Sequence, residues 1–194
     1  GAVGLHCGQG MVPDAAEAAR LVTPRTRAIV LVSPNNPSGA EYPAEVLAGF
    51  RDLARAHGLA LVVDETYRDF DSREGAPHGL FADPDWDDTL IQLYSFSKAF
   101  RLTGHRVGAL VASPARLVEV EKFLDTVAIC PGQLGQIGRH LQRAGGDDRE
   151  FVRSLAAGLG AAKRGVVAAS RQHGNGKAQH DRAHLTLRKN VAPS

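Results

Sequence analysis

The sequence predicts an α/β protein in which a mainly parallel sheet is flanked by helices. Two continuously apolar runs, AIVLV at 28–32 and LALVV at 59–63, have the length and composition of strands that are covered on both faces. Around these runs apolar residues recur at helical spacing, and alternation of the two patterns is typical of α/β folds. No apolar run approaches the roughly 20 residues of a membrane span. The content of 43% hydrophobic and 23% charged residues is ordinary for a soluble domain.

The first predicted helix precedes the strand at 28–32. The sequence from Asp14 to Glu17 resembles a capping box, and Pro24 prevents this helix from continuing. The strand then stops at SPNNPSG (33–39), where two prolines and a glycine exclude regular structure.

A second helix connects the two apolar strands. Pro43 opens it, and Gly58 is its natural stop. Its apolar residues keep a spacing of 3.6 residues: Val46, Leu47, Phe50, Leu53 and Ala54. Beyond the strand at 59–63, the segment 69–88 is polar and contains glycine and proline, which predicts a loop.

Two further strands and a helix complete the pattern. Strands are predicted at 89–94 and 107–112, and helical spacing returns at 115–128. Twelve residues, 95–106, separate these two strands, which is the lower limit for a helical crossover. We therefore expect this pair of strands to be antiparallel.

Polar residues gather where three of the predicted strands end. In open α/β sheets, ligands bind outside the carboxyl ends of the strands. The side chains at these ends supply an amide, an anion, a phenol, hydroxyls, an amine and a guanidinium: Asn36, Asp64, Tyr67, Ser95, Ser97, Lys98 and Arg106. A cofactor with an aldehyde, a basic ring nitrogen, a phenolate oxygen and a phosphate would use this whole set of groups.

Three segments also resemble the signature segments of a known family. SPNNPSG (33–39), VVDETY (62–67) and SFSKAFRLTGHRVG (95–108) resemble those of the class I/II aminotransferases in sequence, order and spacing. These are fold-type-I enzymes that depend on pyridoxal 5'-phosphate. The resemblance covers about residues 1–138 and implies the middle of a large cofactor-binding domain. It also implies amino acid and 2-oxo acid substrates and a homodimer. We expect no metal site, because the cysteines and histidines show no ligand spacing.

The resemblance assigns the central chemistry to Lys98 and Asp64. Lys98 would form the internal aldimine with the cofactor aldehyde and then act as general base and acid. Asp64 would pair with the pyridine nitrogen and keep it protonated, so that the ring can act as an electron sink.

Four further residues are implied to hold the cofactor. Asn36 and Tyr67 would donate hydrogen bonds to the phenolate oxygen of the ring. Ser95 and Arg106 would hold the phosphate, Arg106 through bidentate contacts. Ser97 is a weaker phosphate candidate and is not assigned a role.

Two expectations concern the neighbours of these residues. Lys98 follows an apolar strand and lies between Phe96 and Phe100, which predicts that its side chain is shielded from solvent. We expect Glu65 to be structural, through a contact with solvent or with a helix end.

Other functions remain open at this stage. The same cofactor on the same fold supports β-eliminating lyases and decarboxylases. Reading Ser95 and Lys98 as the SxxK motif of serine acyl-transfer enzymes fails, because neither SDN nor KTG occurs in the sequence. We expect no nucleic-acid partner, because the basic residues near the C-terminus lack interleaved aromatics. Cys7 and Cys130 are expected to be reduced and partly buried in a cytoplasmic protein.

The last third of the chain differs in charge from the rest. Residues 1–138 carry 12 Lys and Arg against 17 Asp and Glu, whereas residues 139–194 carry 11 against 4. Family members are roughly twice this length, and the expected amphipathic helix does not follow residue 139. We hypothesise that 139–194 is a basic tail, disordered or out of frame. We therefore expect weak cofactor binding and little turnover from this chain alone, and a catalytically inactive fragment is an alternative.

Overall fold

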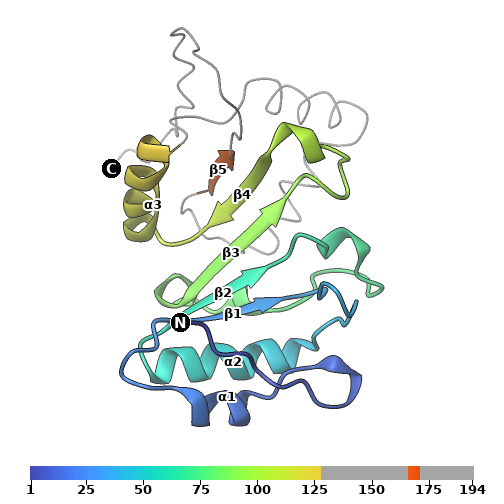
Figure 1. Ribbon diagram of the computed structural model, residues 1–194, viewed down its shortest axis with the longest axis vertical. Helices are drawn as coiled ribbons and strands as arrows, with labels where there is room; N and C mark the ends of the chain where they lie inside the picture. Colours follow the sequence, from blue (N-terminus) through green and yellow to red (C-terminus); the bar gives the residue numbers. More distant parts are fainter. Residues whose placement is uncertain (128–165, 171–194) are drawn as a thin grey trace, which may run out of the picture.

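The described part of the chain is built on one five-stranded sheet. The computed structural model describes residues 1–127 and the backbone of 166–170. The strands lie in the order β1 (Ala28–Val32), β2 (Ala60–Asp64), β3 (Leu90–Ser95), β4 (Val107–Val111) and β5 (Val166–Ser170). Strands β1, β2 and β3 are parallel, β4 is antiparallel to β3, and β5 is antiparallel to β4 (Figure 1). The predicted α/β class is confirmed, as is the antiparallel pairing of the strands on either side of residues 95–106.

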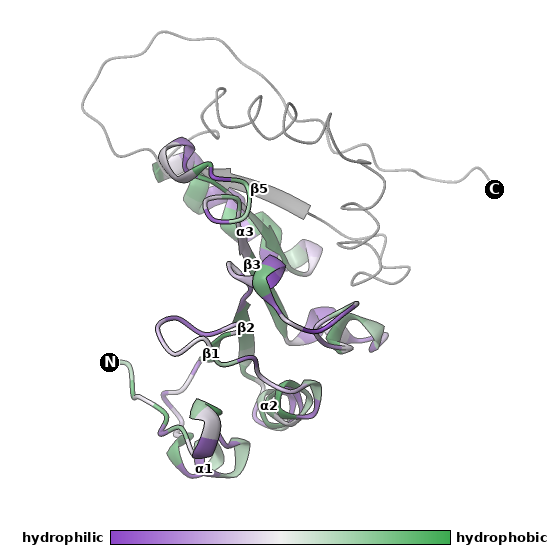
Figure 2. Ribbon diagram, turned by 90° about the vertical axis from the view of Figure 1, so that its right-hand side faces the viewer, coloured by the Kyte–Doolittle hydropathy of each residue, from purple (hydrophilic) through white to green (hydrophobic). Residues whose placement is uncertain are grey.

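Three α-helices accompany the described strands: α1 (Ala15–Leu21), α2 (Ala44–Ala56) and α3 (Pro114–Val127). Asp14 caps α1, because its Oδ1 accepts a hydrogen bond of 2.8 Å from the amide of Ala16. The chain leaves α2 through Gly58, whose φ of 63° favours glycine. Figures 1 and 2 show α1 and α2 together at the β1 end of the sheet, whereas α3 lies at the β4 end.

The segment 69–88 is more structured than its polar sequence predicts. Short 3-10 helices are found at Arg68–Phe70, Leu80–Ala82 and Trp86–Asp88, and others lie at Gln9–Met11 and Thr103–His105. Leu80, Phe81 and Trp86 are buried in the same core as α2. The prediction of a plain loop was wrong here, because three large apolar side chains attach the segment to the core.

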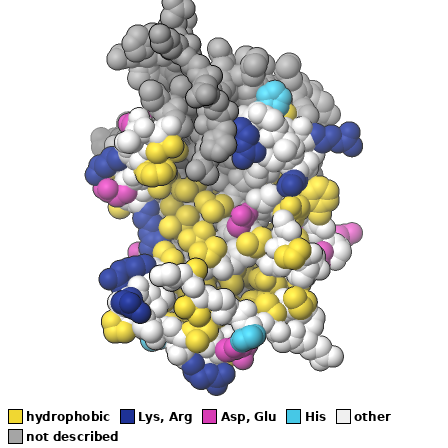
Figure 3. Space-filling model, in the orientation of Figure 1, with side chains coloured by type: hydrophobic (Ala, Val, Ile, Leu, Met, Phe, Trp, Pro, Cys, Tyr) yellow, Lys and Arg dark blue, Asp and Glu magenta, His cyan; other side chains and the backbone are white. Residues whose placement is uncertain are grey.

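The two faces of the sheet differ in how well they are covered. Ile29 and Leu31 of β1 are buried in the core with α2, whereas Val30, between them, is 62% exposed. Val30 shares its face with Val62 and Ile91, its partners in the strand register, and both are half-buried. The expectation that β1 is covered on both faces was therefore wrong for the described residues. Figure 3 shows hydrophobic side chains gathered over the middle of one face of the molecule.

The expectations for the two cysteines and for the C-terminal tail can be compared with the structure only in part. Cys7 is exposed, not partly buried, and Cys130 lies outside the described part. The proposed tail at 139–194 also lies outside it, apart from the backbone of β5. Among the described helices, none has the length and hydropathy needed to cross a membrane.

Candidate active site

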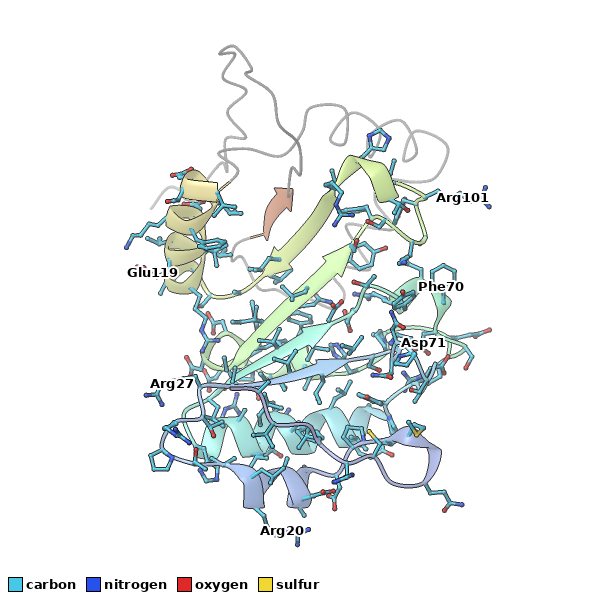
Figure 4. All side chains as sticks on the ribbon, viewed as in Figure 1. Arg20, Arg27, Phe70, Asp71, Arg101 and Glu119 are labelled. Carbon is cyan, nitrogen blue, oxygen red and sulfur yellow. The ribbon has the colours of Figure 1, made fainter. Side chains whose placement is uncertain are left out.

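Three loops meet at the carboxyl edge of the parallel strands. Val32, Asp64 and Leu93 are neighbours in the register, so β1, β2 and β3 reach this edge together. Backbone hydrogen bonds continue past the strand ends, from Ser33 N to Asp64 O (3.0 Å) and from Glu65 N to Leu93 O (2.8 Å). Figure 4 shows Phe70 and Arg101 projecting from the loops at this edge, with Arg27 at the opposite edge of the sheet.

Asn36, Tyr67 and Lys98 come from three different loops and lie in one cluster. The side-chain amide of Asn36 donates a hydrogen bond of 3.2 Å to the Tyr67 hydroxyl. The Nζ atom of Lys98 lies 5.5 Å from the centroid of the Tyr67 ring, a cation–π distance. The structure thus brings together three of the residues singled out from the sequence.

The Lys98 side chain is exposed, and the expectation that it is shielded was wrong for the described residues. Its two aromatic neighbours take the inward positions: Phe96 is fully buried, and its ring lies 5.3 Å from that of Phe100. The amine of Lys98 remains accessible from solvent, beside Tyr67. An accessible primary amine at the carboxyl edge of a sheet can react with a carbonyl compound that binds there.

Asp64 ends β2 with a half-buried carboxylate. Its Oδ1 accepts hydrogen bonds from the amide (2.9 Å) and the hydroxyl (2.6 Å) of Thr66. This is the turn contact that an aspartate at a strand end commonly makes. Within the described residues Oδ2 accepts no hydrogen bond, so the carboxylate is oriented by its turn and retains one oxygen for a further partner.

Arg106 and two serines form a group suited to an anion. Arg106 donates a hydrogen bond of 3.0 Å to Thr103 O and makes a longer contact of 3.5 Å with the Ser97 hydroxyl. The Ser95 hydroxyl accepts a hydrogen bond of 3.2 Å from the amide of Ser97. In the described part of the chain, no carboxylate lies within ion-pair distance of Arg106. Its positive charge is therefore not neutralised by the described residues, as an anion site requires.

The backbone of Arg106 is held in the left-handed region, with φ 52° and ψ 51°. This conformation is uncommon for a residue other than glycine, and such strain often accompanies functional sites. Ser97, the weaker phosphate candidate that was assigned no role from the sequence, is buried, and its hydroxyl lies 3.5 Å from this guanidinium.

Glu65, which the sequence predicts to be structural, lies next to this site. It is buried, with 1% exposure, so the expected contact with solvent is wrong, but it does contact Arg68, the first residue of the 3-10 helix Arg68–Phe70. Its Oε1 lies 2.6 Å from His78 Nε2, and its Oε2 accepts a hydrogen bond from Gln92 and faces Arg68 at 3.5 Å. Burial alone would raise the pKa of Glu65, but the hydrogen bond from His78, together with Arg68 and Gln92, lowers it overall. Strand alternation was the available signal, because Glu65, directly after β2, continues the alternation of the buried Leu61 and Val63.

A hollow elsewhere on the molecule takes no part in this site. It is lined by residues of 22–27 and 57–59, at the amino ends of β1 and β2. The candidate residues all lie at the opposite ends of these strands.

The sequence and the structure were compared with known proteins. The family model described as aminotransferase class I and II matches residues 7–170, which extends past residue 138 and includes β5. The alanine aminotransferase of Mycobacterium tuberculosis is 36% identical over 128 residues, which cover 63% of this chain and 30% of that protein. The arginine–pyruvate transaminase of Pseudomonas aeruginosa is 38% identical over 137 residues, 64% of this chain and 33% of that protein. The chain therefore spans about a third of the length of the relatives it matches.

Solved structures of aminotransferases also resemble this chain in fold. The N-succinyldiaminopimelate aminotransferase of Mycobacterium tuberculosis aligns with a TM-score of 0.63 and 30% identity, over 80% of this chain and 40% of that one. The aspartate aminotransferase of Thermus thermophilus aligns with a TM-score of 0.61 and 29% identity, over 79% of this chain and 39% of that one.

Proposed function

The chain belongs to the aminotransferase class I and II family, and from this premise we propose that its site binds pyridoxal 5'-phosphate and transfers an amino group between an amino acid and a 2-oxo acid. The cluster of Lys98, Tyr67 and Asn36 is the observation that carries the proposal. These residues come from three loops, and a hydrogen bond and a cation–π contact join them.

The chemistry of the side chains fits this cofactor. An exposed amine matches its aldehyde, and a carboxylate with one uncommitted oxygen matches its basic ring nitrogen. The amide of Asn36 and the hydroxyl of Tyr67 match its phenolate oxygen, since both can donate a hydrogen bond to an anion. Arg106 with the hydroxyls of Ser95 and Ser97 matches its phosphate.

Lys98 would have two tasks. Its amine would hold the cofactor through the aldehyde and, when an amino acid substrate takes its place there, would act as the base that accepts the proton of the substrate α-carbon and as the acid that gives a proton back. When bound, pyridoxal phosphate supplies an electron sink that makes this α-proton acidic. The nearby ring of Tyr67 limits where the ammonium group can lie.

The remaining residues would orient the cofactor and hold it in place. Asp64 would keep the ring nitrogen protonated, and its turn contact with Thr66 fixes the direction of the carboxylate beforehand. Asn36 and Tyr67 would set the tilt of the ring, because both are fixed relative to each other. Arg106 would hold the phosphate together with the hydroxyls of Ser95 and Ser97.

We propose only the class of substrate, an amino acid and a 2-oxo acid, and no particular amino donor. The names of the relatives give alanine, arginine and aspartate as amino donors, and the chain covers about a third of those proteins. By the same family relationship we propose that the full-length protein is a homodimer. A β-eliminating lyase, a decarboxylase and a catalytically inactive fragment are the alternatives.

A single-turnover experiment tests the proposal without requiring turnover. The chain is mixed with excess pyridoxal phosphate, and the visible absorbance of the lysine-bound cofactor is measured for the wild type and for Lys98→Ala. We expect this absorbance in the wild type alone. Addition of an amino acid should then bleach it and release the matching 2-oxo acid in an amount equal to the bound cofactor.

Each alternative has its own product. Ammonia together with a 2-oxo acid indicates elimination, and carbon dioxide indicates decarboxylation. Bound cofactor that no amino acid changes indicates an inactive fragment. A wild type with the same spectrum as Lys98→Ala contradicts the cofactor assignment itself.

A further inference from the structure

A buried polar cluster lies directly beneath the candidate site. Glu65 follows β2, His78 belongs to the connection between β2 and β3, and Gln92 belongs to β3. All three side chains are buried, and both oxygens of the Glu65 carboxylate are engaged by them. Arg68, on the same turn as Glu65, supplies a positive charge 3.5 Å from Oε2.

The hydrogen bonds of His78 define its role in this cluster. Its Nδ1 accepts a hydrogen bond of 3.3 Å from the amide of Leu80, so this nitrogen carries no proton. The proton therefore lies on Nε2, 2.6 Å from Glu65 Oε1. His78 thus joins the backbone at Leu80 to the Glu65 carboxylate, with both ring nitrogens used.

Glu65 and Asp64 are neighbours that face opposite sides of the sheet. Successive side chains of a strand alternate between faces, so Asp64 lies on the site side and Glu65 on the core side. The amide of Arg68 donates a hydrogen bond of 3.0 Å to the Glu65 carbonyl, which starts the turn that carries Tyr67. The position of Glu65 therefore constrains Asp64 on one side and Tyr67 on the other.

Apart from the backbone hydrogen bonds that join Asp64 to Ser33 and Glu65 to Leu93, the other attachments of this turn are weaker. The hydrogen bond between Asn36 and Tyr67 is exposed, and Asp64 and Thr66 bond within the turn itself. Water competes for an exposed hydrogen bond, whereas a buried carboxylate strongly favours the donors that compensate its burial. The contacts of Glu65 with His78 and Gln92 are the buried side-chain attachments of the turn to other segments of the chain.

We propose that Glu65 and His78 are positioning residues, which fix the turn 64–67 and thereby the placement of Asp64 and Tyr67 toward the cofactor. This inference rests on the proposed function only for the identity of the ligand. The pair contacts neither cofactor nor substrate, and its effect is transmitted through the backbone of the turn.

Three variants and a matched control test the pair in the full chain. His78→Phe fills the space without a donor, His78→Gln retains an amide donor for Glu65, and Glu65→Gln keeps the shape without the charge. Asp83→Asn is the control, because it disrupts the ion pair of Asp83 with Arg55 (2.9 Å), which joins α2 to the residue that follows the 3-10 helix Leu80–Ala82. The first readout is the set of backbone amide chemical shifts of 36 and 64–67 without cofactor. The second is the dissociation constant of pyridoxal phosphate.

We expect His78→Phe to shift the amides of 36 and 64–67 and to weaken cofactor binding by at least tenfold. His78→Gln should restore both to within about threefold of the wild type, and Asp83→Asn should leave both unchanged. If His78→Phe does not fold, Glu65→Gln takes its place, with smaller shifts in the same amides. The proposal is overturned if the folded variants shift only residues around 78, 80 and 92 and bind the cofactor as the wild type does. If the wild type binds no cofactor, the proposed function fails, and the amide shifts alone decide the positioning role.

Discussion

The side-chain amide of Asn36 donates a hydrogen bond of 3.2 Å to the hydroxyl of Tyr67, and this bond joins the loop after β1 to the turn after β2. The two residues are 31 positions apart in sequence. Their contact brings an amide and a phenol together at one point of the sheet edge, next to the amine of Lys98.

The first prediction is a coupling between these two residues in cofactor binding. Asn36→Ala and Tyr67→Phe each remove a donor, so each should weaken pyridoxal phosphate binding by about 1 kcal/mol, a factor of about five. Because the residues also bond each other, the double variant should lose less than the sum, with a coupling of about 0.5–1 kcal/mol. Cofactor titrations of the four proteins measure this, and strict additivity would show that the pair does not act on one atom of the ligand.

The second prediction concerns the charge of Arg106. If the guanidinium holds a phosphate, Arg106→Gln should weaken pyridoxal phosphate binding by about 1.5–3 kcal/mol, the range for hydrogen bonds to charged groups. Binding of pyridoxal, which has no phosphate, should be unchanged. Arg106→Lys should lie between, because an ammonium group lacks the planar pair of donors.

Arg101→Gln is the matched control for Arg106. It lies on the same loop, is exposed, and has the same left-handed backbone, with φ 53°. It makes none of the contacts with Ser97 and Thr103 that Arg106 makes. Equal losses of affinity in the two variants would assign the effect to the overall charge of the loop and not to a phosphate site.

The helices and strands whose bounds are set by the local sequence pattern could be predicted. β1 has the predicted bounds, 28–32, because its apolar run is bounded by a turn sequence that excludes a strand. The connection 69–88 was not predictable, because its buried Leu80, Phe81 and Trp86 follow neither a helical nor a strand period. Its structure depends on tertiary packing against the core of α2, which no local pattern records.

The residues of the candidate site could be predicted from their side-chain chemistry. Their exposure and the contacts around them could not. Asn36, Tyr67 and Lys98 were selected by residue type and spacing, and the structure brings them together. The exposure of Lys98 was predicted wrongly, since aromatic neighbours in sequence say nothing about which side of the loop they occupy. The partners of Glu65 lie 13 and 27 positions away, a pairing that requires the fold.

The third prediction is a dependence of stability on pH that comes from Glu65. Its pKa in the folded protein lies below the ordinary value of 4.5, so folding favours the charged form. The stabilisation is fully present above about pH 4.5 and is lost as the pH falls through the lower, folded-state pKa. Glu65→Gln lacks this ionisation. The difference in unfolding free energy between wild type and variant should therefore shrink toward low pH, by at most about 1.4 kcal/mol per pH unit.

Urea unfolding of both proteins between pH 7 and pH 3.5 measures this difference. Other carboxylates, such as Asp71 beside Arg73 and Asp83 beside Arg55, also have pKa values lowered by their arginine partners. Because they are present in both proteins, their contributions cancel in the comparison. A difference that stays constant with pH would mean that the charge of Glu65 does not contribute to folding.

The fourth prediction uses two neighbouring residues of β1 that face opposite sides of the sheet. Leu31 is 4% exposed and lies in the core with α2, whereas Val30 is 62% exposed. Leu31→Ala should destabilise the chain by about 2–5 kcal/mol, because it removes buried methyl groups and leaves a cavity. Val30→Ala should cost no more than about 0.5 kcal/mol, the usual range for a surface position. Unfolding of both variants by urea at pH 7 gives the two values. If Val30→Ala cost as much as Leu31→Ala, Val30 would be packed in the folded protein as well, and β1 would be covered on both faces as its sequence suggests.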